Sequence, residues 1–264
     1  MSSSGRDLRL RDKVALVTGG SRSLGRAMCL LFAREGARVG VNYRERRDQA
    51  DEVVKLISEG GGEALAVEAD VSQRDHVEPM VQAVADRFGG IDILVNNAGI
   101  SFYKPLVDHE EEEWDRVLGV NLKSAFLCCK YAIPHMLRRG GGVIINVGSC
   151  HAFATQPTCT SYAASKAALN GFTRSLALEH APDNIRVNCL VPGAFWTDMA
   201  KEAVSRLGKL EEVLPPINAK LPFGRQGEPY EFAEAALFLA ADSGSYTTGQ
   251  VYIIDGGLLA QMNL

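Results

Sequence analysis

The sequence predicts an α/β fold, a doubly wound sheet of seven parallel strands with helices on both faces. Two observations lead to this fold class: short apolar, β-branched runs alternate with helical stretches along the chain, and the connections between them are short. A glycine-rich turn after the first run is typical of Rossmann-type domains. No repeat, low-complexity tract or linker divides the chain, so residues 1–264 are predicted to form one domain.

The predicted strands are the apolar runs, and the predicted helices are the stretches between them. The strands are residues 13–18, 37–42, 63–68, 91–95, 142–147, 185–191 and 250–254. The first helix follows the glycine-rich turn and ends at Glu35, and the others are 46–59, 73–88, 111–139, 161–181 and 229–241. Because the strands are apolar along their length, we expect helices to cover them on both faces.

Residues 193–227 interrupt this alternation. The segment carries Pro215, Pro216 and Pro222 and has no clear strand, although residues 199–207 have a helical pattern. It follows the sixth strand, and open α/β sheets bind ligands beyond the carboxyl ends of their strands. We interpret the segment as a candidate substrate lid, with an ordinary surface excursion as the alternative.

The bulk properties exclude several classes of function. The net charge is −4 in 264 residues, so neither nucleic acid nor an anionic membrane is an expected partner. No apolar run is long enough to cross a membrane, and the first residues lack the apolar core of a signal peptide, so a cytoplasmic protein is expected. The six cysteines include no C-x-x-C pair and are predicted to be free thiols, and no metal site is predicted.

The glycine-rich turn at residues 19–25 is a candidate anion site. It joins the first strand to the first helix, where free backbone N–H groups and the helix dipole point at one place. The second strand, 37–42, completes the βαβ unit that a dinucleotide fingerprint requires. A plain strand–turn–helix connection is the alternative.

Tyr162 and Lys166 lie four residues apart in a predicted helix, and Ser149 stands thirteen residues before the tyrosine. Positions i and i+4 share a helix face, so the lysine ammonium can stand beside the phenol. A cation there lowers the tyrosine pKa from about 10, towards the range of acid–base catalysis. Such a pair also occurs on solvent-facing helices, and the pair alone does not define a site.

Four motifs in this order resemble those of the short-chain dehydrogenase/reductases, including the 3-oxoacyl reductase and glucose dehydrogenase-like members. The motifs are Thr18–Gly25, Asn96–Gly99, Asn121, and Ser149 with Tyr162 and Lys166. The resemblance extends over about residues 13–257. It implies an oxidoreductase that interconverts a ketone and a secondary alcohol with a nicotinamide cofactor.

The resemblance implies a role for each of four candidate catalytic residues. Tyr162 would give or take the proton, and Lys166 would lower its pKa and bond the ribose. Ser149 would orient the substrate oxygen and stabilise its charge, and Asn121 would kink the long helix and hold a water that links Lys166 to solvent. A sugar or polyol dehydrogenase, a 3-oxoacyl carrier-protein reductase and a non-catalytic cofactor sensor are alternatives. A sensor does not need the complete set of four.

The resemblance also implies the cofactor contacts. Asp70 and Val71 would meet the adenine, residues 97–99 the ribose, and Pro192, Gly193 and Thr197 the nicotinamide carboxamide. The complete predicted set is Gly19, Ser21, Arg22, Ser23, Leu24, Gly25, Tyr43, Arg44, Asp70, Val71, Asn97, Ala98, Gly99, Tyr162, Lys166, Pro192, Gly193 and Thr197.

NADP(H) is the predicted cofactor. Tyr43 stands at the end of the second strand, where an acidic side chain would select NAD. Arg44 follows it and Arg22 lies in the turn, so two guanidinium groups can bind a 2′-phosphate. Relatives with similar segments use both cofactors, so dual use with NAD stays open. Ser23 replaces the middle glycine of the family motif, and its hydroxyl could bond a phosphate oxygen.

The substrate is predicted to be a free small molecule of mixed or apolar character. The predicted pocket residues are Ser149, His151, Phe153, Phe195, Trp196 and Met199. Aromatic and thioether groups suit apolar substrate surface, although His151 could instead be satisfied by local backbone. Relatives that act on carrier-bound chains show basic residues near the carboxyl ends of two long helices, where they meet an acidic carrier. The corresponding segments here are 138–142, which keeps two arginines, and 180–183, which has an acidic residue where a base would help.

A homotetramer is expected from the resemblance alone. The family usually assembles through its two long helices, here 111–139 and 161–181. Their apolar side chains could equally belong to the core: Phe126, Leu127, Leu169, Phe172, Leu176 and Leu178.

Overall fold

Seven parallel strands form the centre of the protein, as predicted. The computed structural model describes residues 7–205 and 208–261, so the predicted domain ends 1–6 and 262–264 lie outside the described residues. The strands are β1 (Val14–Val17), β2 (Arg38–Tyr43), β3 (Ala64–Glu68), β4 (Ile93–Asn96), β5 (Gly142–Val147), β6 (Ile185–Pro192) and β7 (Val251–Ile254). Their order in the sheet is β3-β2-β1-β4-β5-β6-β7.

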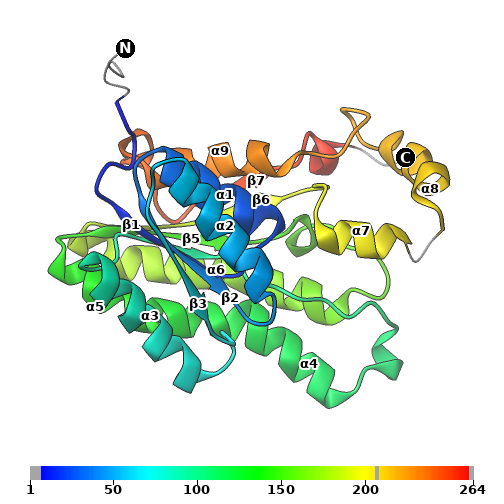
Figure 1. Cartoon of the computed structure of the whole chain (residues 1–264). Coiled ribbons are helices and arrows are strands. Elements are labelled where there is room, and N and C mark those ends of the chain that lie inside the picture. Colours follow the sequence, from blue (N-terminus) through cyan, green and yellow to red (C-terminus); the bar gives the residue numbers. More distant parts are fainter. Residues whose placement is uncertain (1–6, 206–207, 262–264) are drawn as a thin grey trace, which may run out of the picture.

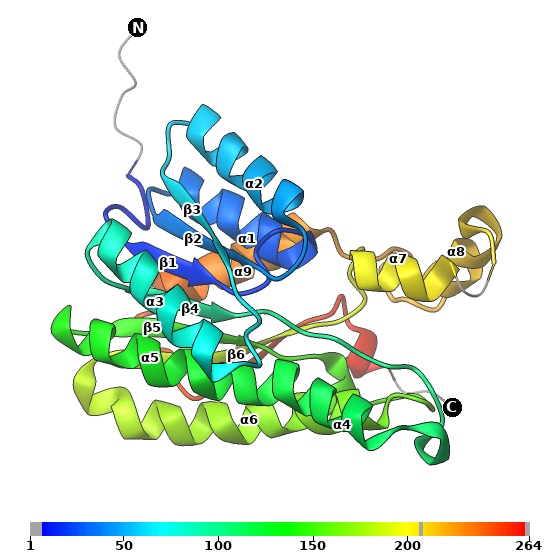
Figure 2. The same ribbon diagram turned by 60° about the horizontal axis from the view of Figure 1, so that its bottom comes forward.

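Helices cover both faces of this sheet (Figures 1 and 2). One face carries α1 (Ser23–Arg34), α2 (Arg47–Glu59) and α9 (Pro229–Ala240), and the other carries α3 (Arg74–Phe88), α5 (Ser124–Arg138) and α6 (Thr160–His180). Three shorter helices are α4 (Glu111–Leu118), α7 (Asp198–Ser205) and α8 (Leu210–Asn218). The three layers and the strand order confirm the predicted doubly wound fold.

Strand β1 illustrates why the strands are apolar along their whole length. Successive side chains of a strand point to opposite faces of the sheet. Accordingly, Ala15 and Val17 pack into the apolar cluster under α1, α2 and α9, while Val14 and Leu16 pack into the cluster under α3, α5 and α6. All four are fully buried, so neither face of β1 can carry a polar side chain.

The strand order reverses between β1 and β4, which are neighbours in the sheet. The chain then continues outward in opposite directions on the two sides, which leaves a crevice beyond the carboxyl ends of these strands. The residues that follow β1, β4, β5 and β6 meet at this edge, and they include the glycine turn, Asn97, Ser149 and Gly193. The fold therefore brings the predicted site motifs to one place.

The predicted long helix 111–139 is not continuous. It consists of α4, a π-helical turn over Gly119–Lys123 and α5. Asn121 lies in the middle of this turn, where the resemblance predicts a kink. A π-turn widens the helix locally and is frequent at functional sites.

The predicted lid begins and ends at the same place on the sheet. The Trp196 N–H donates to the Gly227 carbonyl, and the Gly227 N–H donates to the Ala194 carbonyl, each over 2.9 Å. Helices α7 and α8 extend beyond the sheet from this closed base (Figure 1). The predicted helical piece 199–207 corresponds to α7, and its positions 206 and 207 lie outside the described residues.

Helix α8 was not predicted. Proline inside a helix removes a backbone hydrogen bond, yet α8 contains Pro215 and Pro216 within Leu210–Asn218. Both prolines are exposed, so their missing N–H groups leave no buried carbonyl unsatisfied.

Among the described residues, no helix combines the length and the apolar character needed to cross a membrane.

Candidate active site

The glycine turn is packed so tightly that Gly25 cannot carry a side chain. A Cβ at Gly25 would lie 2.2 Å from the Gly19 carbonyl oxygen and 2.7 Å from Asn97 Nδ2. Gly19 itself has a φ of +61°, in the left-handed region that favours glycine. Glycine at both positions therefore lets the turn close tightly against β4 at the N-terminus of α1, where Arg22, Ser23 and Leu24 line the cleft.

Asn97 and Thr18 hold this turn against β4. Asn97 Nδ2 donates to the carbonyls of Thr18 (2.8 Å) and Gly19 (3.1 Å). The Thr18 hydroxyl oxygen accepts the N–H groups of Asn97 (2.9 Å) and Ala98 (3.0 Å). The sequence assigned Asn97 to the ribose, and the structure adds this bracing role.

Asn42 braces the turn from the other side and was missed in the sequence. Its Oδ1 accepts the Gly19 N–H over 3.1 Å, and its Nδ2 reaches the Ala69 carbonyl over 3.2 Å. Asn42 is 2% exposed. The sequence does contain a signal for this role of Asn42. An asparagine in an otherwise apolar, buried strand needs hydrogen-bond partners, because buried polar groups are nearly always paired.

A cleft of about 670 Å³ opens along the carboxyl edge of the sheet. Every residue of the predicted cofactor set lines it, as do four predicted substrate residues. Those four are Ser149, His151, Phe195 and Met199. Segments from the whole length of the chain thus meet around one cavity.

Two predicted substrate residues, Phe153 and Trp196, do not line this cleft in the structure. Phe153 follows the short 3₁₀ turn Cys150–Ala152 and is 51% exposed. Trp196 lines a second groove with Lys201, whose Nζ lies 5.6 Å from the indole ring. Trp196 is next to the cleft residue Phe195 at the paired base of the lid, where successive extended side chains point to opposite sides.

Several cleft residues were missed in the sequence. They come from loops and helices that only the fold brings to the cavity: Arg46, Ile100, Tyr103, Arg116, Glu202, Gln226 and Leu258. Arg46 could have been found, because it continues the basic run after β2.

Ser149, Tyr162 and Lys166 face one another in the cleft. The Ser149 side chain lies close enough to the Tyr162 hydroxyl to lower the pKa of that hydroxyl. The Lys166 Nζ lies 5.8 Å from the centre of the Tyr162 ring and donates to the Val147 carbonyl over 2.7 Å. His151 packs edge-on against Tyr162 with ring centres 5.6 Å apart.

The predicted lowering of the Tyr162 pKa is not what the structure shows. Burial raises the pKa of Tyr162 above its usual value, and the nearby Ser149 side chain offsets only part of that rise. Lys166 stands over the ring and bonds a carbonyl rather than the phenol oxygen. Burial also lowers the pKa of Lys166, to about 8, with a small opposing effect of Cys189. At neutral pH the lysine still carries most of its charge.

Asn121 is buried, and every polar atom of its side chain has a partner. Its Oδ1 accepts the Ile100 N–H (2.8 Å), and its Nδ2 reaches the Ile100 carbonyl (2.9 Å) and Ser165 Oγ (3.0 Å). A Cβ at Gly99 would lie 3.5 Å from both Asn121 Oδ1 and Lys166 Nζ. Asn121 Oδ1 and Lys166 Nζ therefore both lie close to Gly99, at the wall of the cleft.

Asp70, predicted to meet the adenine, already has protein partners. Its oxygens bond Arg116 (2.8 Å) and the Ser72 hydroxyl (2.7 Å). Burial by itself would raise the pKa of Asp70, but these hydrogen bonds lower it to about 2. The carboxylate is thus fixed, ionised and able to accept further hydrogen bonds at the cleft wall.

Basic side chains gather where β2 ends and at the glycine turn, although the acidic Glu45 also lines the cleft there. Arg22, Arg44 and Arg46 line the cleft, and Arg44 pairs with the adjacent Glu45. Within residues 7–205 and 208–261, no carboxylate pairs with Arg22 or Arg46. The Tyr43 side chain is buried, and its hydroxyl bonds Glu68 over 3.4 Å. Two unpaired guanidinium groups are thus available to an anion at this end.

Comparisons with known proteins agree with this geometry. The model of a family described as enoyl-(acyl carrier protein) reductase matches residues 19–259. The chain is 43% identical to 3β-hydroxysteroid dehydrogenase 1 of Eggerthella lenta over 94% of both chains. It is 40% identical to the 3-oxoacyl-acyl-carrier-protein reductase of Thermotoga maritima, over 96% of this chain and 100% of that one.

Among solved structures, a similar one is a 7α-hydroxysteroid dehydrogenase in complex with NADH and 7-oxo glycochenodeoxycholic acid. It has a TM-score of 0.89 and 34% identity, over 97% of this chain and 98% of that one. Fold, cleft and relatives define an oxidoreductase that acts on CH–OH and C=O groups. The chain belongs to the short-chain dehydrogenase/reductase family.

Proposed function

We propose that the protein is an NADP(H)-dependent carbonyl reductase that interconverts a ketone and a secondary alcohol on a small free substrate. The observation that carries this proposal is the shared cleft: the tight glycine turn, the arginines after β2 and the Ser149–Tyr162–Lys166 group line one cavity. The glycine turn fits a pyrophosphate, because it lines the cleft and contains the N-terminus of α1, where free backbone N–H groups favour an anion. Arg22 and Arg46 add unpaired positive charge at the same end.

When bound, the nicotinamide would supply or accept the hydride at its C4 atom. In reduction, Tyr162 gives its hydroxyl proton to the substrate oxygen, and Ser149 donates a hydrogen bond to that oxygen as negative charge develops. The Lys166 ammonium stabilises the phenolate that remains, against the burial that disfavours it. In oxidation the same groups act in reverse.

Asn121 is proposed to act through Lys166. Its side chain fixes the loop at Ile100 to helix α6 through Ser165. Since Asn121 Oδ1 and Lys166 Nζ both lie close to Gly99, a water there would connect the lysine to solvent. This water would return the proton that leaves Tyr162.

The arginines predict a preference for NADPH over NADH. Arg44→Asp is expected to weaken NADPH binding roughly tenfold or more, because a charge-assisted bond is lost and repulsion is added. NADH binding should change little. Arg47→Asp is the matched control, since Arg47 makes the same charge change but pairs with Asp51 outside the cleft. Equal loss for both cofactors, measured by titration, would contradict the assignment.

Charges at the helix ends support a free substrate over a carrier-bound one. Arg139 donates to buried Asp92 over 2.7 Å, and Arg138 contacts His135 over 2.9 Å. His180 pairs with Asp183 over 2.9 Å. Arg139 and His180 are thus paired with carboxylates within the chain, and Arg138 is left as the one of these three bases without an acidic partner among the described residues. A docking surface for an acidic carrier needs more free positive charge than this.

A 3-oxoacyl reductase is the second candidate, because of the similarity to the Thermotoga maritima enzyme. A 3-oxo steroid is a free substrate to test, given the similarity to 3β-hydroxysteroid dehydrogenase 1. Steady-state kinetics with oxo-steroids, simple ketones, aldoses and a carrier-linked 3-oxoacyl thioester decide between them. We expect the highest kcat/KM for a free ketone; a much higher value for the thioester or an aldose would overturn the proposal.

We also propose a cytoplasmic homotetramer. On the long helices, Leu127 and Leu169 are core residues, but Phe126 is 49% and Leu178 is 78% exposed. Large exposed apolar side chains on neighbouring helices suit an interface between copies. Sedimentation of the purified chain as a monomer would contradict the tetramer.

A further inference from the structure

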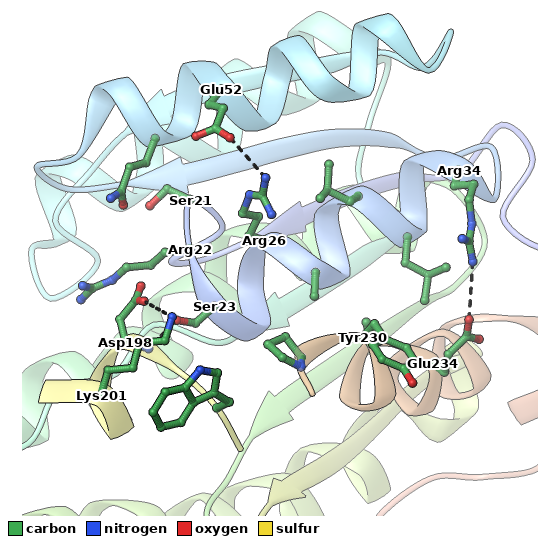
Figure 3. A pocket seen from close by; sticks show the side chains of 17 residues that line it. Ser21, Arg22, Ser23, Arg26, Arg34, Glu52, Asp198, Lys201, Tyr230 and Glu234 are labelled. Carbon is green, nitrogen blue, oxygen red and sulfur yellow. Dashed lines mark hydrogen bonds and ion pairs between the residues drawn. The ribbon is translucent and has the colours of Figure 1, made fainter. Parts of the chain in front are cut away.

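Helix α7 separates two cavities. On one side lies the active-site cleft, to which this segment contributes Thr197, Met199 and Ala200. On the other side lies a groove of about 740 Å³ between α1, α2, α7 and α9, to which it contributes Trp196, Asp198 and Lys201. Figure 3 shows this groove, with Asp198 and Lys201 facing α1. A shift of α7 therefore changes the shape of the cleft and of the groove together.

One hydrogen bond joins α7 to the glycine turn. The backbone N–H of Asp198 donates to Ser23 Oγ over 3.0 Å, between residues 175 positions apart in the chain. Ser23 lines both cavities, together with Ser21 and Arg22. The bond thus lies in the wall between cleft and groove, where the turn would meet a pyrophosphate.

Ser23 adopts a backbone conformation that suits glycine better. Its φ is +48°, in the left-handed region that side chains with a Cβ rarely occupy. Serine nevertheless stands here, where the related motif has a glycine. The hydroxyl supplies the contact to Asp198, which a glycine could not make.

We propose that Ser23 is a positioning residue that links the bound cofactor to the lid helix. The proposal rests on the cofactor site assigned above. In accepting the Asp198 N–H, the hydroxyl keeps its own proton free to donate to a pyrophosphate oxygen. A hydroxyl that donates to an anion becomes a stronger acceptor, so cofactor binding strengthens the bond to Asp198 and holds α7 against the turn.

The coupling must act in both directions. If the cofactor stabilises the position of α7, then a correctly placed α7 raises the affinity for the cofactor by the same factor. Loss of the bond is therefore expected to weaken cofactor binding and to release α7. If Ser23 only stabilised the fold, its loss would not make cofactor binding and the position of α7 change together.

The start of α7 offers a matched pair of variants. Asp198 is the first residue of the helix, and Thr197 Oγ1 accepts the Ala200 N–H over 3.2 Å, as an N-cap does. Proline is well tolerated at the first helical position. Asp198→Pro thus removes the N–H that Ser23 accepts, whereas Asp198→Ala removes only the side chain and its 3.8 Å pair with Lys201.

Hydrogen exchange of the backbone, with and without saturating NADPH, tests the proposal. In the unmodified protein, NADPH should protect the turn at residues 19–25 and slow exchange of residues 199–204 by up to about twofold, the range expected when one existing hydrogen bond is strengthened. Ser23→Ala, Ser23→Gly and Asp198→Pro should keep protection of the turn and lose that of α7. Asp198→Ala should behave like the unmodified protein. Ser23→Gly also removes the strain at φ +48°, so it remains informative if Ser23→Ala folds poorly.

The hydrogen-exchange experiment distinguishes failure of the Ser23 role from failure of the proposed cofactor site. If α7 gains the same protection in Ser23→Ala and Ser23→Gly while the turn is protected, the positioning role is wrong and the cofactor site stands. If NADPH protects neither segment of the unmodified protein, the proposed cofactor site is wrong, and the role of Ser23 falls with it.

Discussion

Tyr162→Phe is expected to lower kcat by ~10²–10⁴-fold, the usual contribution of a general acid. The phenyl ring keeps its packing against His151, but no proton remains to reach the substrate oxygen. Cofactor binding should survive, because the positions proposed for the pyrophosphate and the 2′-phosphate are untouched. Stopped-flow reduction of a ketone, together with a cofactor titration, measures both effects.

Tyr246→Phe provides the control for this variant. Its side chain is fully exposed, so the same chemical change there should leave turnover unchanged. Turnover of Tyr162→Phe within a few-fold of the unmodified protein would show that another group delivers the proton.

Gly25→Ala is expected to abolish measurable cofactor binding, with a loss of ~10²-fold or more if two phosphate contacts disappear. The added Cβ would lie 2.2 Å from the Gly19 carbonyl oxygen, which is backbone and cannot move aside without opening the turn. The fold should survive, since the sheet and both apolar clusters lie elsewhere. Calorimetric titration with NADPH and thermal unfolding separate the two effects.

Gly171→Ala is the matched control for Gly25→Ala. A Cβ at Gly171 meets nothing within 4 Å, and the residue lies inside α6. Alanine there should stabilise the helix slightly and leave affinity unchanged. If Gly25→Ala bound NADPH as tightly as this control, the turn would not be the pyrophosphate site.

Short sequence patterns predicted those features of the fold and site that are determined by residues close together in the chain. The inner strand runs are apolar on both sides because both faces are buried there, whereas the edge strands β3 and β7 are only partly buried. The positions of all seven runs agree with the structure to within about two residues. The turn at residues 19–25 and the Tyr162–Lys166 spacing depend on fixed local geometry as well. Their meeting in one cleft follows from parallel strands, whose carboxyl ends share an edge.

The sequence could not predict features that depend on tertiary contacts. Phe153 and Trp196 looked like pocket residues by type, but the direction of a loop side chain depends on the turn that carries it. The proline-containing α8 contradicts helix propensity, which tertiary context can override. The raised Tyr162 pKa follows from burial, and burial of a helix face is a property of the whole fold.

Transfer of the hydride itself tests the central claim most directly. The protein is incubated with a reducible ketone and NADPH that carries deuterium at the transferred C4 position, and the alcohol is analysed by mass spectrometry and NMR. The proposed reaction predicts one deuterium on the carbinol carbon for each NADPH oxidised, with none at that carbon when deuterium is supplied only by the solvent. NADPH oxidation that leaves no deuterium in the alcohol, or no oxidation with any ketone of the panel, would contradict the proposed function.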